Sequence, residues 1–305
     1  MRIQTLIILV LLAGSASAWG PNTHMHITDE AMAQCEEDPE CQNSLIFTTI
    51  NNNQDAYRCG YMFPDVHVIY YYAKFQNYQA THAYSFCGKA LEYAENDGER
   101  AAAYGCFSHL IADSIAHNYF IPGIIDNTQI PNDIIHPIAE GLVETKYIDN
   151  IRTPHSMDNV DLYLPLFNRA AGEGEDLTKE AYLLRTALGG QNFYSSSYTT
   201  NEDTWVLKMW KGIADFIVWM DVVNPGMGED FIFDTIDDTY QYYMTGTYPP
   251  LDPTGEQALD IQKSRTQIKT VISFIGIPLV LLILYIVYKK LDLGNRFKGR
   301  RIRFL

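Results

Sequence analysis

Residues 99–119 read ERAAAYGCFSHLIADSIAHNY, and this stretch decides the expected fold. Its apolar side chains recur at helical spacing. Within it His109, Asp113 and His117 follow one another at intervals of four residues. At 100° per residue these three side chains drift only about 80° around a helix, so they project from one face. We therefore expect a long helix that carries a row of potential metal ligands, with the central carboxylate placed to serve two metals.

Helical periodicity also dominates the rest of the chain, whereas the alternation typical of strands is scarce. We therefore predict an all-α domain. The expected helices cover residues 24–36, 42–52, 64–75, 80–96, 99–119, 133–150, 176–188, 202–222 and 229–243. The remainder of 151–201 is predicted to be irregular connection, because it holds the segments GEGED and YSSSYTT.

The composition is that of a globular protein with an acidic surface. Of the 305 residues, 47% are hydrophobic and 19% charged, which allows a sizeable core and excludes wholesale disorder. The formal net charge is −15, and between Trp19 and Gln267 there are 36 acidic against 13 basic side chains. A domain of this charge repels polyanions, which argues against duplex nucleic acid as a partner.

Both ends of the chain resemble targeting segments. Residues 1–18 combine an early arginine, an apolar run and the triplet Ala16-Ser17-Ala18, which is typical of a secretory signal peptide that leaves Trp19 as the first mature residue. Residues 270–288 carry no charge and are long enough for a membrane-spanning helix. The tail 289–305 is basic, so the positive-inside rule predicts that it is cytoplasmic. We expect a single-pass protein of the cell membrane with an outward domain, 19–246, and a Pro-rich stalk, 247–269.

The cysteines fit an oxidising compartment. All five lie in the predicted outward domain, where disulfides persist. Cys35 and Cys41 are the expected pair, because only the short segment EEDPE separates them. An odd number leaves one thiol over, and the other pairing stays open among Cys59, Cys87 and Cys106. No CxxC motif occurs, which argues against a zinc site made of thiolates.

Histidine and carboxylate residues recur at spacings that suit a metal site. His136 and Glu140 repeat the four-residue step of the 99–119 row. Asp65 follows Pro64 at the expected start of the helix 64–75, His82 lies near the start of the helix 80–96, and His24 follows Trp19 by five residues. A single histidine on an apolar face is more often a hydrogen-bonded core residue, and a His–Glu pair is often a surface ion pair. Together, however, five histidines and three acids on successive helices favour a metal site, since imidazole and carboxylate are natural zinc ligands.

In order and residue type, these positions resemble the superfamily of zinc-dependent phospholipases C and single-strand-specific nucleases, in its phospholipase C/D branch. The resemblance covers roughly 19–145. It implies an all-α fold that binds three zinc ions and uses the mature N-terminal tryptophan as a ligand. Some members have a longer gap between the aspartate and the second histidine of the row, which is four residues here.

The resemblance also implies how the ligands are shared among the zinc ions. The first zinc is expected to be held by Asp65, His82, His109 and Asp113. Asp113 then bridges to a second zinc, which is completed by His24 and by the amine and carbonyl of Trp19. The third zinc is expected to use His117, His136 and Glu140. His26 competes with His24 for its role, and His67 and His155 match no position of the family.

These expectations lead to a hydrolase of phosphodiesters. Three divalent cations would neutralise the phosphodiester and lower the pKa of a bound water toward about 7, with Asp65 as the expected general base. The predicted anchor and the acidic charge favour a phospholipid substrate and thus a phospholipase C. Two alternatives remain: a single-strand nuclease or 3′-nucleotidase, which would stack a base on an aromatic ring, and a surface protein whose metals only stabilise the fold.

Overall fold

The computed structural model describes residues 21–67, 81–125, 143, 157, 159–172, 175–186 and 227–254. The chain divides into two compact units, and all of these residues belong to the first, which consists of Met1–Ile130 and Ile134–Leu259. The described residues form helices and no strand, which confirms the all-α prediction for this part of the chain.

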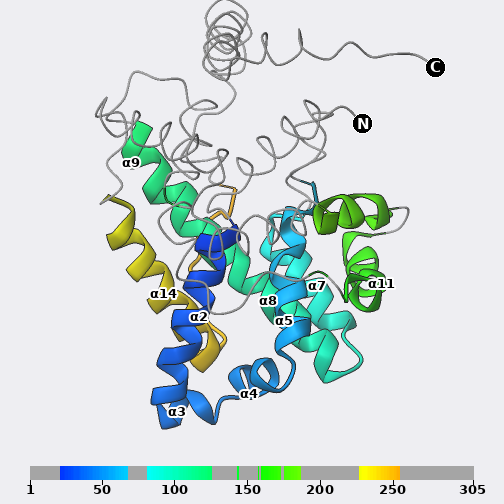
Figure 1. The fold of residues 1–305 in the computed structure, drawn as a ribbon, viewed down its shortest axis with the longest axis horizontal. Helices are drawn as coiled ribbons and strands as arrows, with labels where there is room; N and C mark the ends of the chain where they lie inside the picture. The colour runs from blue at the N-terminus through cyan, green and yellow to red at the C-terminus, as the bar shows by residue number, and fades with distance from the viewer. Residues whose placement is uncertain are drawn as a thin grey trace, which may run out of the picture. The chain divides into compact units, whose positions relative to one another are not determined.

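Figure 1 shows the helices of the described residues. They are α2 (Pro21–Glu37), α3 (Pro39–Gln42), α4 (Leu45–Asn52), α5 (Gln54–Tyr61), the 3-10 helix η1 (Phe63–His67), α7 (Tyr84–Tyr93), α8 (Asp97–Ile115), the π-helical turn η3 (Ala116–Phe120), α9 (Ile121–Ile125), α11 (Val160–Ala171) and α14 (Met227–Thr245). Residues 178–186 are also helical.

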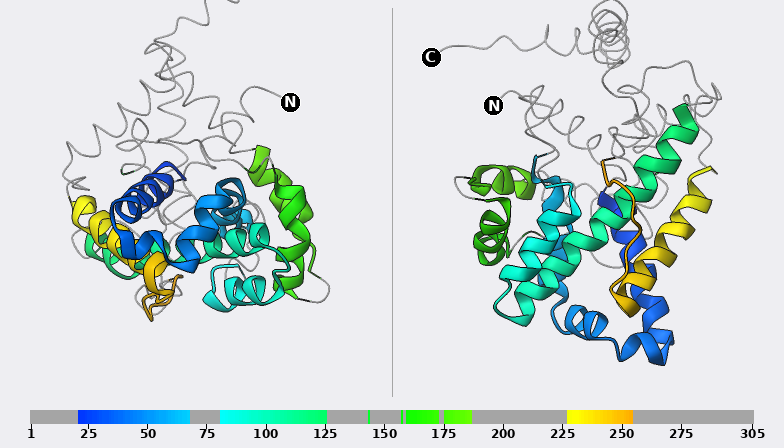
Figure 2. Two further views of the ribbon diagram at one scale, coloured as in Figure 1. Left: turned by 90° about the horizontal axis from the view of Figure 1, so that it is seen from below. Right: turned by 180° about the vertical axis from the view of Figure 1, so that it is seen from behind.

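Helix α8 is the element around which the others pack. It begins at Asn96, whose side chain accepts a hydrogen bond of 3.0 Å from the backbone N–H of Glu99, as expected of an N-cap. From Ala101 to Ile115 every residue is buried, so this helix is enclosed on all sides. Helices α8, η3 and α9 follow one another as one continuous helical segment. Helices α2 and α14 pack beside this segment, and α5 and α7 pack against α8 (Figures 1 and 2).

Two glycines allow α5 and α8 to approach each other closely. A Cβ atom on Gly60 would lie 1.9 Å from the carbonyl oxygen of Ala102, and one on Gly105 would lie 2.1 Å from that of Tyr57. Both distances are far shorter than van der Waals contact, so only glycine fits at either position. This contact fixes the register between the two helices, which matters because candidate site residues follow each glycine in the chain.

Two disulfides join neighbouring helices. Cys35 in α2 pairs with Cys41 in α3, which confirms the predicted pair, and Cys87 in α7 pairs with Cys106 in α8. Cys59 is the remaining thiol and is buried in α5. The second disulfide covalently holds α7 against the helix that carries His109 and Asp113.

Helices α5 and α11 are among those that lie where the sequence predicts none. Helix α5 begins within the polar run NNNQD, which is a weak start for a helix, but burial of Tyr57, Cys59 and Tyr61 against α8 stabilises it. Helix α11 contains Pro165 in a segment predicted to be irregular. It buries Phe167, whose ring stacks on that of Phe63 with 3.8 Å between the centroids.

Several predicted segments lie outside the described residues. They are the signal peptide 1–18, the helix 202–222, most of the helix 133–150, the membrane span 270–288 and the basic tail 289–305. In the described ranges, no helix combines the length and apolar character that crossing a membrane requires.

Candidate metal centre

Five of the predicted ligands come from four separate places in the chain and meet beside α8. His24 lies in the first turn of α2, Asp65 lies in η1 directly after α5, and His82 directly precedes α7. His109 and Asp113 stand one turn apart on α8. The close approach of α5 and α8 therefore brings Asp65 to the face of α8 that carries the ligand row.

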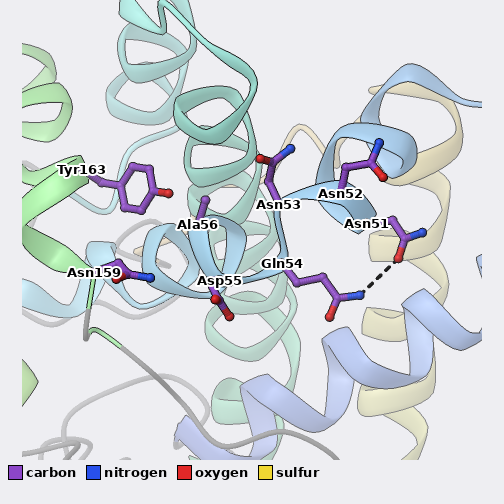
Figure 3. Close-up of a pocket in the computed structure, with 8 residues that line it drawn as sticks. All are labelled: Asn51, Asn52, Asn53, Gln54, Asp55, Ala56, Asn159 and Tyr163. Atoms are coloured by element: carbon purple, nitrogen blue, oxygen red, sulfur yellow. Dashed lines mark hydrogen bonds between the residues drawn. The ribbon is translucent and has the colours of Figure 1, made fainter.

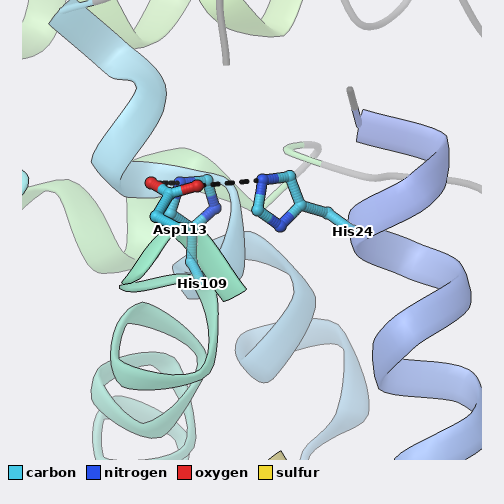
Figure 4. A group of neighbouring side chains, drawn as sticks. All are labelled: His24, His109 and Asp113. Carbon is cyan, nitrogen blue, oxygen red and sulfur yellow. Dashed lines mark ion pairs between the residues drawn. The ribbon is translucent and has the colours of Figure 1, made fainter. Parts of the chain in front are cut away.

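The two carboxylate oxygens of Asp113 face different imidazoles. Oδ1 lies 3.3 Å from Nε2 of His24, whereas Oδ2 lies 3.1 Å from Nε2 of His109 and 3.3 Å from Nε2 of His82. Figure 4 shows His24 approaching the carboxylate from α2, on the side away from the backbone of α8. A carboxylate with one oxygen in each of two donor groups has the arrangement of a bridging ligand.

Asp65 completes a four-donor group around Oδ2 of Asp113. Its Oδ1 lies 3.4 Å from Nε2 of His82 and 3.6 Å from Nε2 of His109. With zinc–ligand bonds of about 2.0–2.2 Å, the corners of a tetrahedron are about 3.3–3.6 Å apart. The four measured distances between an imidazole nitrogen and a carboxylate oxygen, 3.1 to 3.6 Å, match this spacing. Two imidazoles and two carboxylates also form a donor set that suits zinc.

Several of these atoms lack hydrogen-bond partners among the described residues. They are Nε2 of His24, both ring nitrogens of His109, Oδ1 of Asp65 and both oxygens of Asp113. The side chains of His24, His109 and Asp113 are fully buried, and that of Asp65 is 4% exposed. Because buried polar atoms are normally paired, these converging donors at ligand spacing form a group that could hold a cation.

The pKa shifts within the cluster are also consistent with a bound cation. Burial would raise the pKa of Asp113, but His109, His24 and His82 hold it well below its usual range. Burial and the neighbouring His109 lower the pKa of His24, which favours the neutral ring with a lone pair for a metal. Burial acts to lower the pKa of His82 as well, yet the carboxylates of Asp113 and Asp65 raise it to about 9. Without a metal, a proton on His82 offsets part of the buried negative charge.

Tyr61 orients the ring of His24 by contacting the nitrogen that does not face Asp113. Its hydroxyl lies 3.1 Å from Nδ1 of His24, so the tautomer that donates from Nδ1 keeps its lone pair on Nε2, toward Asp113. Burial raises the pKa of Tyr61 well above its ordinary value, so the hydroxyl stays neutral. The ring of His24 also stacks on that of His109, with 4.3 Å between the centroids. Sequence reasoning missed Tyr61, because no spacing links it to a histidine 37 positions away.

His117 lies beyond Asp113 in the π-helical turn η3 and is buried. Its Nδ1 lies 2.5 Å from the carbonyl oxygen of Pro253. A carbonyl oxygen only accepts, so Nδ1 donates, and the lone pair of the neutral ring is on Nε2. π-Helical turns inside α-helices often occur at functional sites.

Of the remaining candidates, most lie outside the described residues, and one lies inside them but belongs to neither donor group found there. Trp19, His136, Glu140 and His155 lie outside the described residues. His26 is half-buried, and within the described ranges neither of the two donor groups compatible with a metal includes it. Those two groups are His24 with His109 and Asp113, and Asp65 with His82 and His109.

A cavity of about 440 Å³ lies elsewhere, between the α4–α5 connection and α11 (Figure 3). Its lining is mostly amide side chains, together with Asp55 and Tyr163, and it shares no residue with the metal cluster. Because it holds no convergent set of imidazoles and carboxylates, we assign it no part in the metal chemistry.

Comparison with known proteins adds one finding. Residues 23–155 match the family model described as zinc dependent phospholipase C. The matched segment begins one residue before His24 and includes Asp65, His82, His109 and Asp113. The chain gives no significant match to a curated protein or to a solved structure.

Proposed function

We propose that this protein is a zinc-dependent phosphodiesterase, and specifically a phospholipase C that releases phosphorylated headgroups from phospholipids. The observation that carries the proposal is the placement of Asp113, with one oxygen toward His24 and the other toward His82 and His109, inside a segment that matches zinc dependent phospholipase C. A carboxylate that places one oxygen beside His24 and the other beside His82 and His109 supports two neighbouring metals, which is an arrangement typical of phosphoryl chemistry.

The residues of the site have distinct tasks in this proposal. His24, His82, His109, Asp65 and Asp113 hold the metals, and bound zinc supplies a Lewis acid and a water of lowered pKa. Asp65 is also the proposed general base, because it is the cluster member whose side chain keeps some exposure, 4%, while its Oδ1 faces the imidazoles. Burial of the others excludes bulk water from the ligand atoms and strengthens their electrostatic interactions.

Three finer points belong to the same proposal. The full centre holds three zinc ions, with Trp19 completing the second site and His117, His136 and Glu140 forming the third. The chain is anchored in the cell membrane by residues 270–288, with the domain outside and the basic tail in the cytoplasm. A phospholipid then lies within reach of the site, and the net charge of −15 disfavours the alternative polyanionic substrate of a single-strand nuclease.

The proposal is tested on the full chain after dialysis against a chelator. Zinc is added back, and hydrolysis of a phosphatidylcholine analogue and of a single-stranded oligonucleotide is measured in parallel. We expect zinc-dependent release of phosphocholine. Cleavage of the oligonucleotide alone would favour the nuclease, and zinc binding without hydrolysis of either substrate would favour a metal that only stabilises the fold.

A pair of aspartate variants separates the site from general effects of charge. Asp113→Asn removes a carboxylate whose two oxygens face three imidazoles, so we expect its rate to fall roughly 100-fold or more, beyond the 10- to 100-fold cost of altering an outer-shell partner. Asp97→Asn is the control, because Asp97 is exposed on the same helix and pairs with Arg100 at 2.6 Å. Full activity in Asp113→Asn would contradict the hydrolase proposal.

A further inference from the structure

The segment that follows α14 runs back along α8 instead of leaving the domain at once. The ring of Tyr248 stacks on that of Tyr84 with 4.3 Å between the centroids and lies 5.3 Å from that of Phe107. Five residues later, Pro253 reaches His117. Ten residues of α-helix rise about 15 Å, a distance that five residues can span, so the segment follows the direction of the helix, with bends at 250–251 and a turn at 253–254. Figure 2 shows this course in orange beside α8 in the right-hand view.

Two backbone carbonyls of this segment bind consecutive side chains of the π-helical turn. The carbonyl oxygen of Pro253 lies 2.5 Å from Nδ1 of His117, and that of Asp252 accepts a hydrogen bond of 2.7 Å from the amide of Asn118. Asn118 also donates to the carbonyl of Ser114 at 2.8 Å, so its amide joins α8 to the segment. These two contacts hold the segment against the π-helical turn η3.

The segment is itself fixed by a capping interaction. The carboxylate of Asp252 accepts hydrogen bonds from the backbone N–H of Thr254 at 3.0 Å and from its hydroxyl at 2.8 and 2.9 Å. Pro253, between them, is buried and has a restricted φ angle. The orientation of the Pro253 carbonyl is therefore determined by the Asp252 cap and by the stacked ring of Tyr248 at the other end.

We propose that residues 248–254, named the strap from here on, position His117 for metal binding by fixing the tautomer that carries its proton on Nδ1. The carbonyl of Pro253 stabilises that tautomer, which presents Nε2 as the ligand atom. The inference rests on the proposed function, because it takes His117 as a zinc ligand. It goes further by giving the segment between the domain and the C-terminal residues a direct effect on one metal site.

The test uses the full chain and loosens the strap without touching a proposed ligand. Asp252→Ala removes the cap, and Asp176→Ala is the matched control, because Asp176 caps Thr178 through the same Asp-x-Thr pattern at the exposed start of the helix 178–186. Tyr248→Ala loosens the other end of the strap and serves as a second variant, since Tyr248 is 38% exposed and is no core residue. Circular dichroism checks that each protein is folded.

Two measurements that do not depend on enzyme activity test the effect of these variants on His117 and on zinc binding. Long-range ¹H–¹⁵N spectra of zinc-free protein report the tautomer of His117, assigned with His117→Gln. Zinc content after dialysis against increasing chelator reports affinity. We expect the Nδ1–H tautomer in the wild type and in Asp176→Ala, and a mixture of tautomers in the strap variants. One zinc per chain should also bind about 10- to 100-fold more weakly in the strap variants, as found when outer-shell partners are removed.

The possible outcomes distinguish a failure of the positioning role of the strap from a failure of the proposed function. If the strap variants keep both the Nδ1–H tautomer and the zinc affinity of the wild type, the positioning role is wrong while the zinc enzyme stands. If all sites of Asp252→Ala and Tyr248→Ala weaken alike, the strap acts on the fold as a whole and the proposal is also wrong. A wild-type chain that binds no zinc would overturn the proposed function itself.

Discussion

Asp113 is the residue on which the candidate centre depends most. Its two oxygens face the imidazoles of His24, His82 and His109, which come from three separate parts of the chain, so it can serve a metal on each side. An asparagine there would keep the size and one oxygen, but it would lose the negative charge that lowers the cost of two neighbouring cations. Sequence alone could predict this residue, because its place midway between His109 and His117 puts all three on one helix face.

The hydroxyl of Tyr61 acts on the metal centre through His24, which a conservative substitution that keeps the ring can test. Tyr61→Phe leaves Nδ1 of His24 without its acceptor, so we expect zinc affinity to fall about 10- to 100-fold in chelator competition. Tyr57→Phe is the control, because its hydroxyl binds that of Tyr243 at 2.5 Å, one helical turn away. That variant should keep its zinc and lose about 1 kcal/mol of stability. Equal loss of zinc in both would assign Tyr61 a packing role only.

The thiol of Cys59 should be inert in the folded protein. Burial raises its pKa to about 12, and a raised pKa means that the reactive thiolate is almost absent at pH 8. Titration with a thiol reagent at pH 8 should therefore find no reactive group in the native chain. One thiol per chain should appear after unfolding without reductant, because the other four cysteines are paired. Prompt reaction of the native protein would contradict the burial of this side chain.

At the level of elements, the contact of α5 with α8 decides where the ligands meet. Gly60→Ala or Gly105→Ala would force a methyl group into a backbone carbonyl, so we expect a loss of about 1–3 kcal/mol or more of unfolding free energy. Gly88→Ala in α7 is the control, because its nearest neighbour would be a side-chain atom 4.0 Å away. Removing glycine from that helix interior should instead stabilise the protein by about 1 kcal/mol.

Chemical denaturation measures the loss of stability in the Gly60 and Gly105 variants and the gain in the Gly88 variant. Zinc content shows whether the metal centre is affected as well. Asp65 follows Gly60 by five residues, and His109 follows Gly105 by four, so separating the helices should also weaken zinc binding. Gly60→Ala protein with the stability and zinc content of the wild type would show that the contact is looser than described.

The sequence predicts elements well where periodicity is strong and poorly where packing decides. The row of His109 and Asp113 on α8 follows from helical geometry, whereas no spacing in the sequence predicts the π-helical turn at 116–120, where His117 and Asn118 contact the strap. Helix α5 begins with turn-like residues, and only its burial against α8 reveals it. The Pro-rich composition of this region led to the prediction of a stalk, but composition carries no information about which surface a segment contacts, so the packing of 248–254 along α8 could not be predicted.

For the molecule as a whole, the metal centre resolves a conflict between charge and burial. The chain carries a formal net charge of −15, and its described unit encloses the carboxylates of Asp65 and Asp113 in its interior. Buried carboxylates destabilise a fold unless a positive charge or strong hydrogen bonds compensate them. Zinc supplies that charge in the proposed holo form, so folding stability and metal occupancy should be coupled.

This coupling predicts a large thermal effect of metal removal. A zinc ion at 1,000 times its dissociation constant stabilises the native state by about 4 kcal/mol, which corresponds to roughly 8–16 °C in Tm for a unit of this size. We therefore expect zinc-stripped protein to unfold at least that much lower in differential scanning calorimetry and to recover when zinc is added back. Asp113→Asn should lose most of the recovery, because the remaining imidazoles no longer share a charged ligand. Asp97→Asn should recover fully, since it removes the same charge from an exposed position on the same helix. An unchanged Tm after complete removal of zinc would mean that the buried carboxylates are compensated within the chain, and the metal centre would then lose its energetic basis.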